Sequence, residues 1–197
     1  MRDTCIRTKI EFIGDGAERL NIKQKEWIEL LPEIDEKKCL ICSHGNIDFC
    51  QSSITNSINM RFQCQSKDLI REDVNGDCFL FKSIEDAEEF AKMLFFLWNS
   101  DGSTLELDYA DLYQYFSSSS SVLRPITLLA KNELVNINDG IVACFSLSSG
   151  SKNALADIYE TANYVESMIG EDVICLVTDL IVPKIVNQKV EYFHVEN

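Results

Sequence analysis

The sequence predicts an α/β or α+β protein in which helices pack against a mixed sheet. Two stretches with helical spacing, at residues 84–98 and 152–169, are separated and followed by short runs rich in β-branched and aromatic residues. The predicted order after residue 83 is α-β-α-β-β-α-β-β, which is typical of helices laid against one sheet. The 197 residues, 46% of them hydrophobic, supply enough apolar side chains for one sizeable core or for two small lobes.

Residues 1–82 predict a strand-rich N-terminal lobe. Alternation at residues 4–13 predicts a strand, followed by the turn Gly14-Asp15-Gly16 and by a helix at residues 21–31 that stops at Pro32. Four short strands then follow, at residues 39–43, 47–52, 58–64 and 77–82. His44-Gly45-Asn46 predicts a hairpin turn and Asn75-Gly76 a second turn.

Residues 83–197 predict a second lobe, or one unit continuous with the first. Ser83 is placed to cap the helix at 84–98, whose apolar second half, MLFFLW, favours a position between two packed layers. A strand at 104–109 leads into a helix at 110–116. The remaining predicted elements are strands at 126–130 and 141–147, the helix at 152–169, and strands at 172–182 and 189–195.

Composition and charge narrow the class of protein. The first residues lack the apolar stretch of a secretion signal and the longest apolar run, at 93–98, is too short to cross a bilayer, so we expect a cytoplasmic protein with its eight cysteines reduced. The net charge is −14, with −5 in residues 1–100 and −9 in residues 101–197. This charge repels nucleic acid and anionic lipid and attracts basic surfaces, although acidity for solubility alone explains it equally well.

The segment KKCLICSHGNIDFC is a weak candidate for a zinc site. Its possible ligands are Cys39, Cys42, His44 and Cys50. The pair between the two cysteines, Leu40-Ile41, favours an extended strand over the tight turn that a zinc knuckle needs. The segment IEFIGDGAERL likewise resembles a phosphate loop only in its Gly-x-Gly, and a plain turn fits it better. We therefore expect neither a metal nor another cofactor.

Acidic residues gather in the segment LELDYADLYQYF and just before it. Glu106, Asp108 and Asp111 lie within six positions, with Asp101 upstream. Glu106 and Asp108 share one face of the predicted strand, and Asp111 begins a helix whose dipole favours a negative charge. This pattern is consistent with ordinary exposed acids, with a partner-binding surface, or with an acid/base pair.

The same segment carries a family resemblance. A long apolar helix, a short linker and then ELDYADL resemble the FtsZ/tubulin superfamily, in which a central helix leads into N-x-D-[FY]-A-D-[VL]. Asp108, Tyr109, Ala110 and Asp111 match that loop, and Glu106 stands where the family has asparagine. Residues 140–183 look like the family's strand, small-residue turn, long helix and strand, and KVEYFHV is similar to its closing strand. The resemblance covers roughly residues 84–195, and the glycine-rich nucleotide signature of the family is absent.

This resemblance implies an FtsZ C-terminal-domain-like second half and a part in GTP hydrolysis on a neighbouring subunit. Without a nucleotide signature of its own, the chain is not expected to be a self-sufficient GTPase. With two histidines and neither a Gly-x-Ser-x-Gly nor a P-loop motif, no catalytic set stands out either.

Three functions remain open. The first is a non-catalytic, immunity- or antitoxin-type protein that masks a basic partner such as a nuclease toxin through Asp101, Glu106, Asp108 and Asp111. The second is an accessory or capping protein of an FtsZ/tubulin-like filament. The third is a small enzyme that uses Asp108 with Asp111, or Cys42 with His44.

Overall fold

The computed structural model describes residues 8–14, 16–31, 39–44, 59–64, 78–81, 83–99, 124–150 and 154–196. Its helices are α1 (Arg19–Leu30), α2 (Ile84–Asn99), the 3-10 helix η3 (Lys131–Asn136) and α4 (Ala154–Glu166). Its strands are β1 (Thr8–Gly14), β2 (Cys39–His44), β3 (Asn59–Cys64), β4 (Cys78–Phe81), β5 (Arg124–Leu129), β6 (Ile141–Ser148), β7 (Ile174–Ile181) and β8 (Lys189–Val195).

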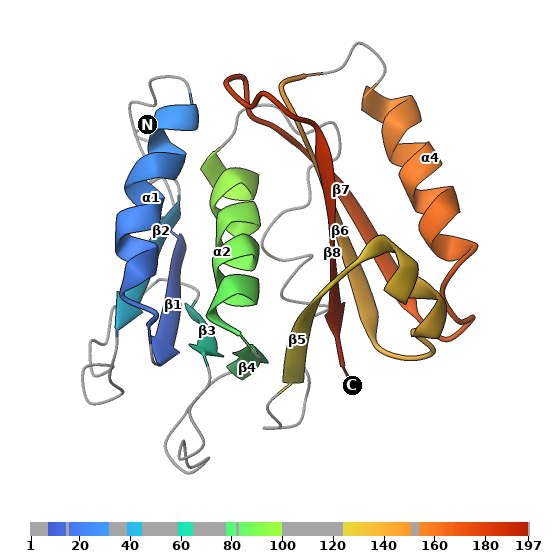
Figure 1. Ribbon diagram of the computed structural model, residues 1–197, viewed down its shortest axis with the longest axis horizontal. Helices are drawn as coiled ribbons and strands as arrows, with labels where there is room; N and C mark the ends of the chain where they lie inside the picture. Colours follow the sequence, from blue (N-terminus) through green and yellow to red (C-terminus); the bar gives the residue numbers. More distant parts are fainter. Residues whose placement is uncertain are drawn as a thin grey trace, which may run out of the picture.

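The eight strands form one mixed sheet in the order β2-β1-β3-β4-β5-β8-β6-β7 (Figure 1). Strands β1 to β5 run parallel to one another, β6 and β7 are parallel to each other, and β8 lies antiparallel between β5 and β6. The chain is thus an α/β protein with helices on a mixed sheet, and the predicted fold class is confirmed at this level. The sheet continues from β4 to β5, across the boundary drawn between the two predicted lobes at residues 82 and 83.

Strand directions differ from what the turn residues suggest. Strands β3 and β4 are parallel, so the segment that joins them does not close a hairpin; the turn predicted at Asn75-Gly76 lies outside the described residues. Among the described residues, β2 pairs only with β1, in the parallel direction. The strands predicted at 47–52 and 104–109 and the helix predicted at 110–116 lie outside the described residues.

Helix α2 begins as the sequence predicts and is buried as predicted. The Asp86 amide donates a hydrogen bond to Ser83 Oγ at 3.0 Å, so Ser83 caps the helix. The five side chains from Met93 to Leu97 are all buried. Helix α2 contacts α1 and also contacts β2 and β7, the two edges of the sheet. A sheet whose opposite edges both reach one helix must curl around it, and this explains why no side of the MLFFL segment faces water.

A chain of aromatic rings runs through the main core. Phe12 of β1 stacks on Phe81 of β4 with ring centroids 6.1 Å apart, and Phe81 lies 5.5 Å from Phe90 of α2. Phe90 in turn meets the edge of Phe193 of β8 at 4.9 Å. All four rings are fully buried, so the two halves of the chain share one core.

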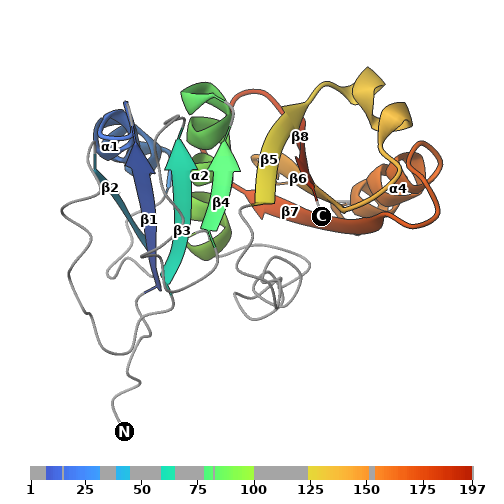
Figure 2. The same ribbon diagram turned by 90° about the horizontal axis from the view of Figure 1, so that it is seen from below.

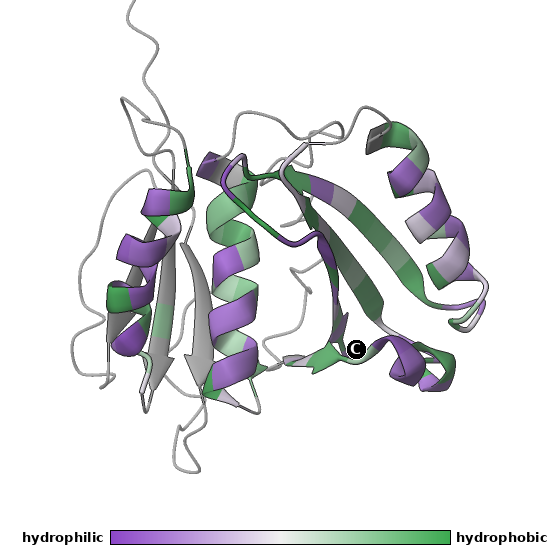
Figure 3. Ribbon diagram, turned by 45° about the horizontal axis from the view of Figure 1, so that its top comes forward, coloured by the Kyte–Doolittle hydropathy of each residue, from purple (hydrophilic) through white to green (hydrophobic). Residues whose placement is uncertain are grey.

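A smaller second core lies on the opposite face of β6 and β8. Residues along β6 alternate between the two cores: Ala143 and Phe145 face α2, whereas Val142 and Cys144 pack with Val165 of α4. Seen from below in Figure 2, α1 lies at one end of the sheet and α4 at the other, with α2 between them. Figure 3 shows β6 and β7 as mostly hydrophobic strands, and β6 is buried along all but its last residue. No helix within the described ranges is long and apolar enough to span a membrane.

Candidate functional site

The carboxylates singled out from the sequence lie outside the described part of the chain. Residues 100–123 contain Asp101, Glu106, Asp108 and Asp111, so their arrangement stays a prediction. The cysteine and histidine cluster is described only in part. Strand β2 gives Cys39 and Cys42 an extended backbone, as predicted, and it also includes His44, which was predicted to begin a hairpin turn; Cys50 lies outside the described residues. Among the described residues, no group of three or more His, Cys, Asp or Glu side chains is placed to hold a metal ion.

Residues 16–18, which begin at the second glycine of the Gly-x-Gly segment, form a turn before α1. Gly16 has φ +78°, in the left-handed region that favours glycine, and α1 begins three residues later. Arg19, in the first turn of α1, donates to Glu88 Oε2 of α2 from Nε at 3.0 Å and from Nη2 at 2.7 Å. The positive charge at the start of α1 is therefore paired with a carboxylate of α2, and this ion pair joins the two helices.

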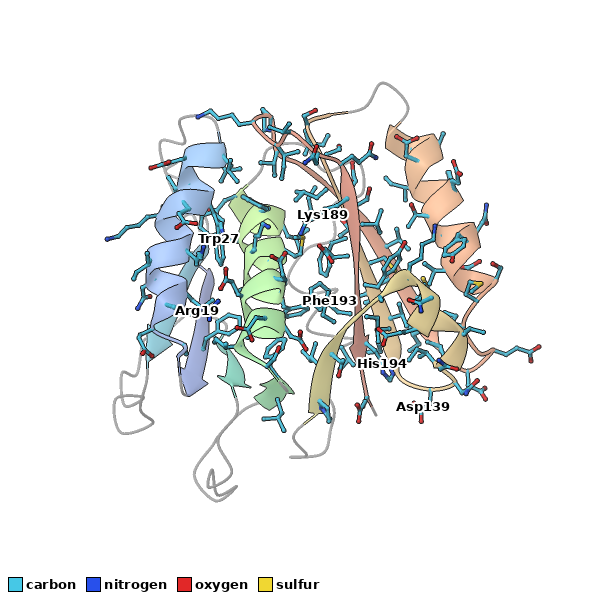
Figure 4. The ribbon with its side chains drawn as sticks, viewed as in Figure 1. Arg19, Trp27, Asp139, Lys189, Phe193 and His194 are labelled. Carbon is cyan, nitrogen blue, oxygen red and sulfur yellow. The ribbon has the colours of Figure 1, made fainter. Side chains whose placement is uncertain are left out.

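Lys23 and Lys189 also form ion pairs with carboxylates of the chain. Lys23 lies 3.1 Å from Glu26 and 3.8 Å from Glu88, and thereby extends the α1–α2 contact. Lys189 of β8 reaches Glu89 of α2 at 2.9 Å. Figure 4 shows Arg19 and Lys189 on the two sides of α2. These ion pairs tie α1 and β8 to α2.

The Glu89 carboxylate is the centre of the second group of ion pairs. Burial disfavours its charged form, but the hydrogen bond from Lys189 and the charge of Lys92 outweigh that effect and hold the pKa of Glu89 below its ordinary value. Burial also opposes the charge of Lys189, yet hydrogen bonds to Glu191 and Glu89 raise the pKa of Lys189. Both partners are therefore charged at neutral pH, which is the arrangement of a structural ion pair.

His194, one of only two histidines, has a structural position. Its Nε2 donates a hydrogen bond to the carbonyl oxygen of Asp139 at 2.9 Å, and 8% of the residue is exposed. A Cβ on neighbouring Gly140, which has φ +82°, would lie 2.3 Å from the carbonyl oxygen of Val195. The contact thus fixes the turn before β6 against the end of β8, as Figure 4 shows for Asp139 and His194.

Cys144 and Cys175 form a pair of free thiols in the second core. They lie on the neighbouring strands β6 and β7, where Cys175 pairs with Val142 and Cys144 pairs with Val177. A hydrogen bond with Cys175, together with burial, raises the pKa of the Cys144 thiol. The same hydrogen bond lowers the pKa of Cys175, against the opposing effect of burial. Cys175, which is also less buried, is therefore the more readily ionised thiol.

Several exposed acids that make no ion pair with a described residue lie on and after α4. From residue 154 to residue 183 the sequence has no lysine and no arginine, but it has six acidic residues. Four of them are exposed: Glu160, Glu166, Glu171 and Asp172. Helix α4 packs its inner side on β7, so its outer side faces water. We define this outer side, with the two acids that follow the helix, as the acidic α4 surface.

The sequence predicts a contact surface at the dense acidic cluster around Asp108, which lies outside the described residues and stays a prediction. The acidic α4 surface was not predicted, and it is marked in the sequence by a long stretch without any basic residue. The absence of lysine and arginine from residues 154–183 can be read from the sequence, and it is the signal that marks the acidic α4 surface. Comparison with models of known protein families gave no match, and no curated protein matched the sequence either.

Proposed function

We propose that this chain is a non-catalytic acidic protein that binds and masks a basic protein partner, in the manner of an immunity protein or antitoxin for a toxic nuclease. The observation that carries the proposal is the division of charge in the described chain. Arg19, Lys23 and Lys189 pair with carboxylates of the chain itself, whereas the exposed acids of the α4 surface make no ion pair with a residue that the structure describes. The surplus negative charge is thus available to a partner.

The physics of association supports this use of charge. With 14 negative charges in excess, the protein attracts a basic surface over about one Debye length, roughly 8–10 Å at physiological salt. Such steering raises the rate of association, and complementary charges suppress binding to acidic competitors. In this proposal the acids at residues 101–111 extend the same surface, and neither nucleic acid nor a membrane is a direct partner.

The experiment that tests the proposal is native co-purification from the source cell at low salt, followed by mass spectrometry of the bound proteins. A small basic protein recovered at a one-to-one ratio is the expected result. Recovery of only acidic or neutral proteins, in the absence of any stoichiometric basic one, would contradict the proposal. The recovered protein should be released by raising the salt concentration, because the attraction is between exposed charges.

A second proposal is an accessory or capping protein of an FtsZ/tubulin-like filament. The order of β6, α4, β7 and the closing strand β8 supports it, because the resemblance at residues 84–195 implies a strand, long helix and strand followed by a closing strand. In this reading the acidic loop at residues 105–111 docks on a filament end. Sedimentation with FtsZ polymers tests it. If the protein does not co-sediment with the polymers and does not change their GTPase rate, the proposal is removed.

A further inference from the structure

Two large apolar side chains stand on the outer side of α4. Leu155 is 48% exposed and Tyr159 is 63% exposed. They are four residues apart, so they lie one above the other on the same side of the helix. Ile158 and Val165, by contrast, are buried against the sheet. Leu155 and Tyr159 thus add an apolar ridge to the acidic α4 surface.

Nothing else in the described chain occupies this ridge. The side chains of Tyr159 and the adjacent Glu160 make no hydrogen bond, ion pair or ring contact with the residues that the structure describes, whereas the Tyr164 ring lies under the ammonium group of Lys131 at 4.1 Å. Asn163 and Glu166 continue the exposed side toward the end of the helix. A partner could therefore reach the ridge without displacing any contact within these ranges.

We propose that the outer side of α4 is a docking surface for a lysine- or arginine-rich amphipathic helix of the partner. This inference rests on the proposed function and adds the place and the kind of segment recognised. Residues four apart on a helix form a ridge that fits between the side chains of a facing helix, which accounts for the apolar contact. The acids beside the ridge select a cationic segment, because no basic residue of α4 opposes such a charge.

The two kinds of side chain have different roles in the encounter. Glu160 and Glu166, at the rim, attract the basic segment and set the rate of association. Leu155 and Tyr159 are buried only in the complex and set the rate of dissociation, since tyrosine is among the residues that most often dominate binding energy. The ridge and its flanks span about 17 Å of helix, which suits a small interface.

The probe is a synthetic peptide of lysine and leucine with leucines spaced three and four apart, compared with a scrambled peptide of identical composition. Binding rates are measured by surface plasmon resonance on immobilised protein. The wild type should bind the amphipathic peptide at least tenfold more tightly than the scrambled one. Y159A should speed dissociation about tenfold, while E160Q and E166Q together should slow association severalfold.

Two matched controls come from α1. Ile22 is 64% exposed and Glu29 is exposed, so I22A and E29Q remove the same kinds of group from another helix. These variants should bind like the wild type. Because all the altered side chains face solvent, circular dichroism should show unchanged folding for every variant.

Three results would overturn the inference: equal binding of the two peptides, no binding of either, or equal effects of Y159A and I22A. Loss of a homodimer in Y159A would also overturn it, because a second copy would then be the occupant. The proposed function is tested by a different result: it fails if co-purification yields no basic partner. A basic partner whose binding ignores Y159A would leave the proposed function standing and remove only the α4 surface.

Discussion

At the scale of single residues, the thiol pair Cys144 and Cys175 gives a direct chemical test. The thiolate is the reactive form, and the hydrogen bond that the two sulfurs share lowers the pKa of Cys175 while raising that of Cys144. We predict that iodoacetamide at neutral pH labels Cys175 well before Cys144 in the folded protein. Peptide mass spectrometry after timed quenching measures the order. Equal rates for the two cysteines in the native state would contradict the assignment.

The Glu89–Lys189 ion pair predicts how stability depends on pH. Because the pKa of Glu89 is lowered in the folded protein, its contribution is present above the ordinary value of 4.5 and is lost as pH falls through the folded pKa. Because the pKa of Lys189 is raised, its contribution is present below 10.5 and is lost as pH rises through the folded pKa. E89Q should therefore cost about 1 kcal/mol at neutral pH, since the groups are partly exposed.

Urea unfolding of the wild type and E89Q at several pH values measures this effect. The difference in the free energy of unfolding should be constant near neutrality and shrink below pH 4.5. E160Q, which removes an exposed carboxylate without a partner in the described chain, is the matched control and should differ little from the wild type. A difference that persists unchanged at pH 2 would show that E89Q acts through packing instead of charge.

Residue-level contacts were predictable only where both partners are close in sequence. The Ser83 cap follows from a serine directly before a helical pattern, and it is present. The contact between His194 and the Asp139 carbonyl joins positions 55 apart, and nothing in the sequence around either residue marks it. Such a contact exists only because β8 lies beside the turn that precedes β6.

At the scale of elements, the cap of α2 can be tested by substitution. Ser83 Oγ accepts the Asp86 amide, one of the amides at a helix start that have no partner inside the helix. S83A should lower the free energy of unfolding by about 1 kcal/mol, whereas S83D should retain most of the stability. Thermal or urea unfolding measures both. S167A, which removes an exposed hydroxyl after α4, should have little effect; equal losses from S83A and S167A would contradict the capping role.

Helices and strands were largely predictable, but their neighbours in the sheet were not. Hydrophobic spacing located α1, α2, α4 and β8 to within a few residues, because each element has one or more apolar faces of regular period. Strand order depends on which crossover connections the chain makes. The last strand, β8, lies between β5 and β6, and no local pattern in KVEYFHV indicates that position.

At the scale of the whole molecule, the shared sheet and core predict one cooperative unfolding transition. Phe90 of α2 contacts Phe81 from the first half and Phe193 from the second. F90A should cost about 3–5 kcal/mol, because a large buried ring leaves a cavity that the surroundings fill only in part. Far-ultraviolet circular dichroism and tryptophan fluorescence should report the same midpoint for the wild type. Two separated transitions would show that the halves fold independently.

The sequence predicts the sign of the charge at the candidate site, but it does not predict that the site lies on α4. Net charge and its bias toward the second half can be counted in the sequence, and they favour a basic partner. Which acids remain available to a partner depends on which of them the fold pairs with its own cations. Glu88 pairs with Arg19 and Glu89 pairs with Lys189, so neither is available. The exposed ridge of Leu155 and Tyr159 likewise emerges only when the packed side of α4 is known.

The central claim is that exposed, unopposed acids steer a basic partner to this protein. The most direct test is the association rate constant with the co-purified partner, measured by stopped-flow fluorescence from about 20 mM to about 500 mM salt. We predict that the rate constant falls at least tenfold over this range, and that E160Q with E166Q lowers it at low salt while leaving it unchanged at high salt. A slow rate constant that does not change with salt would contradict the account.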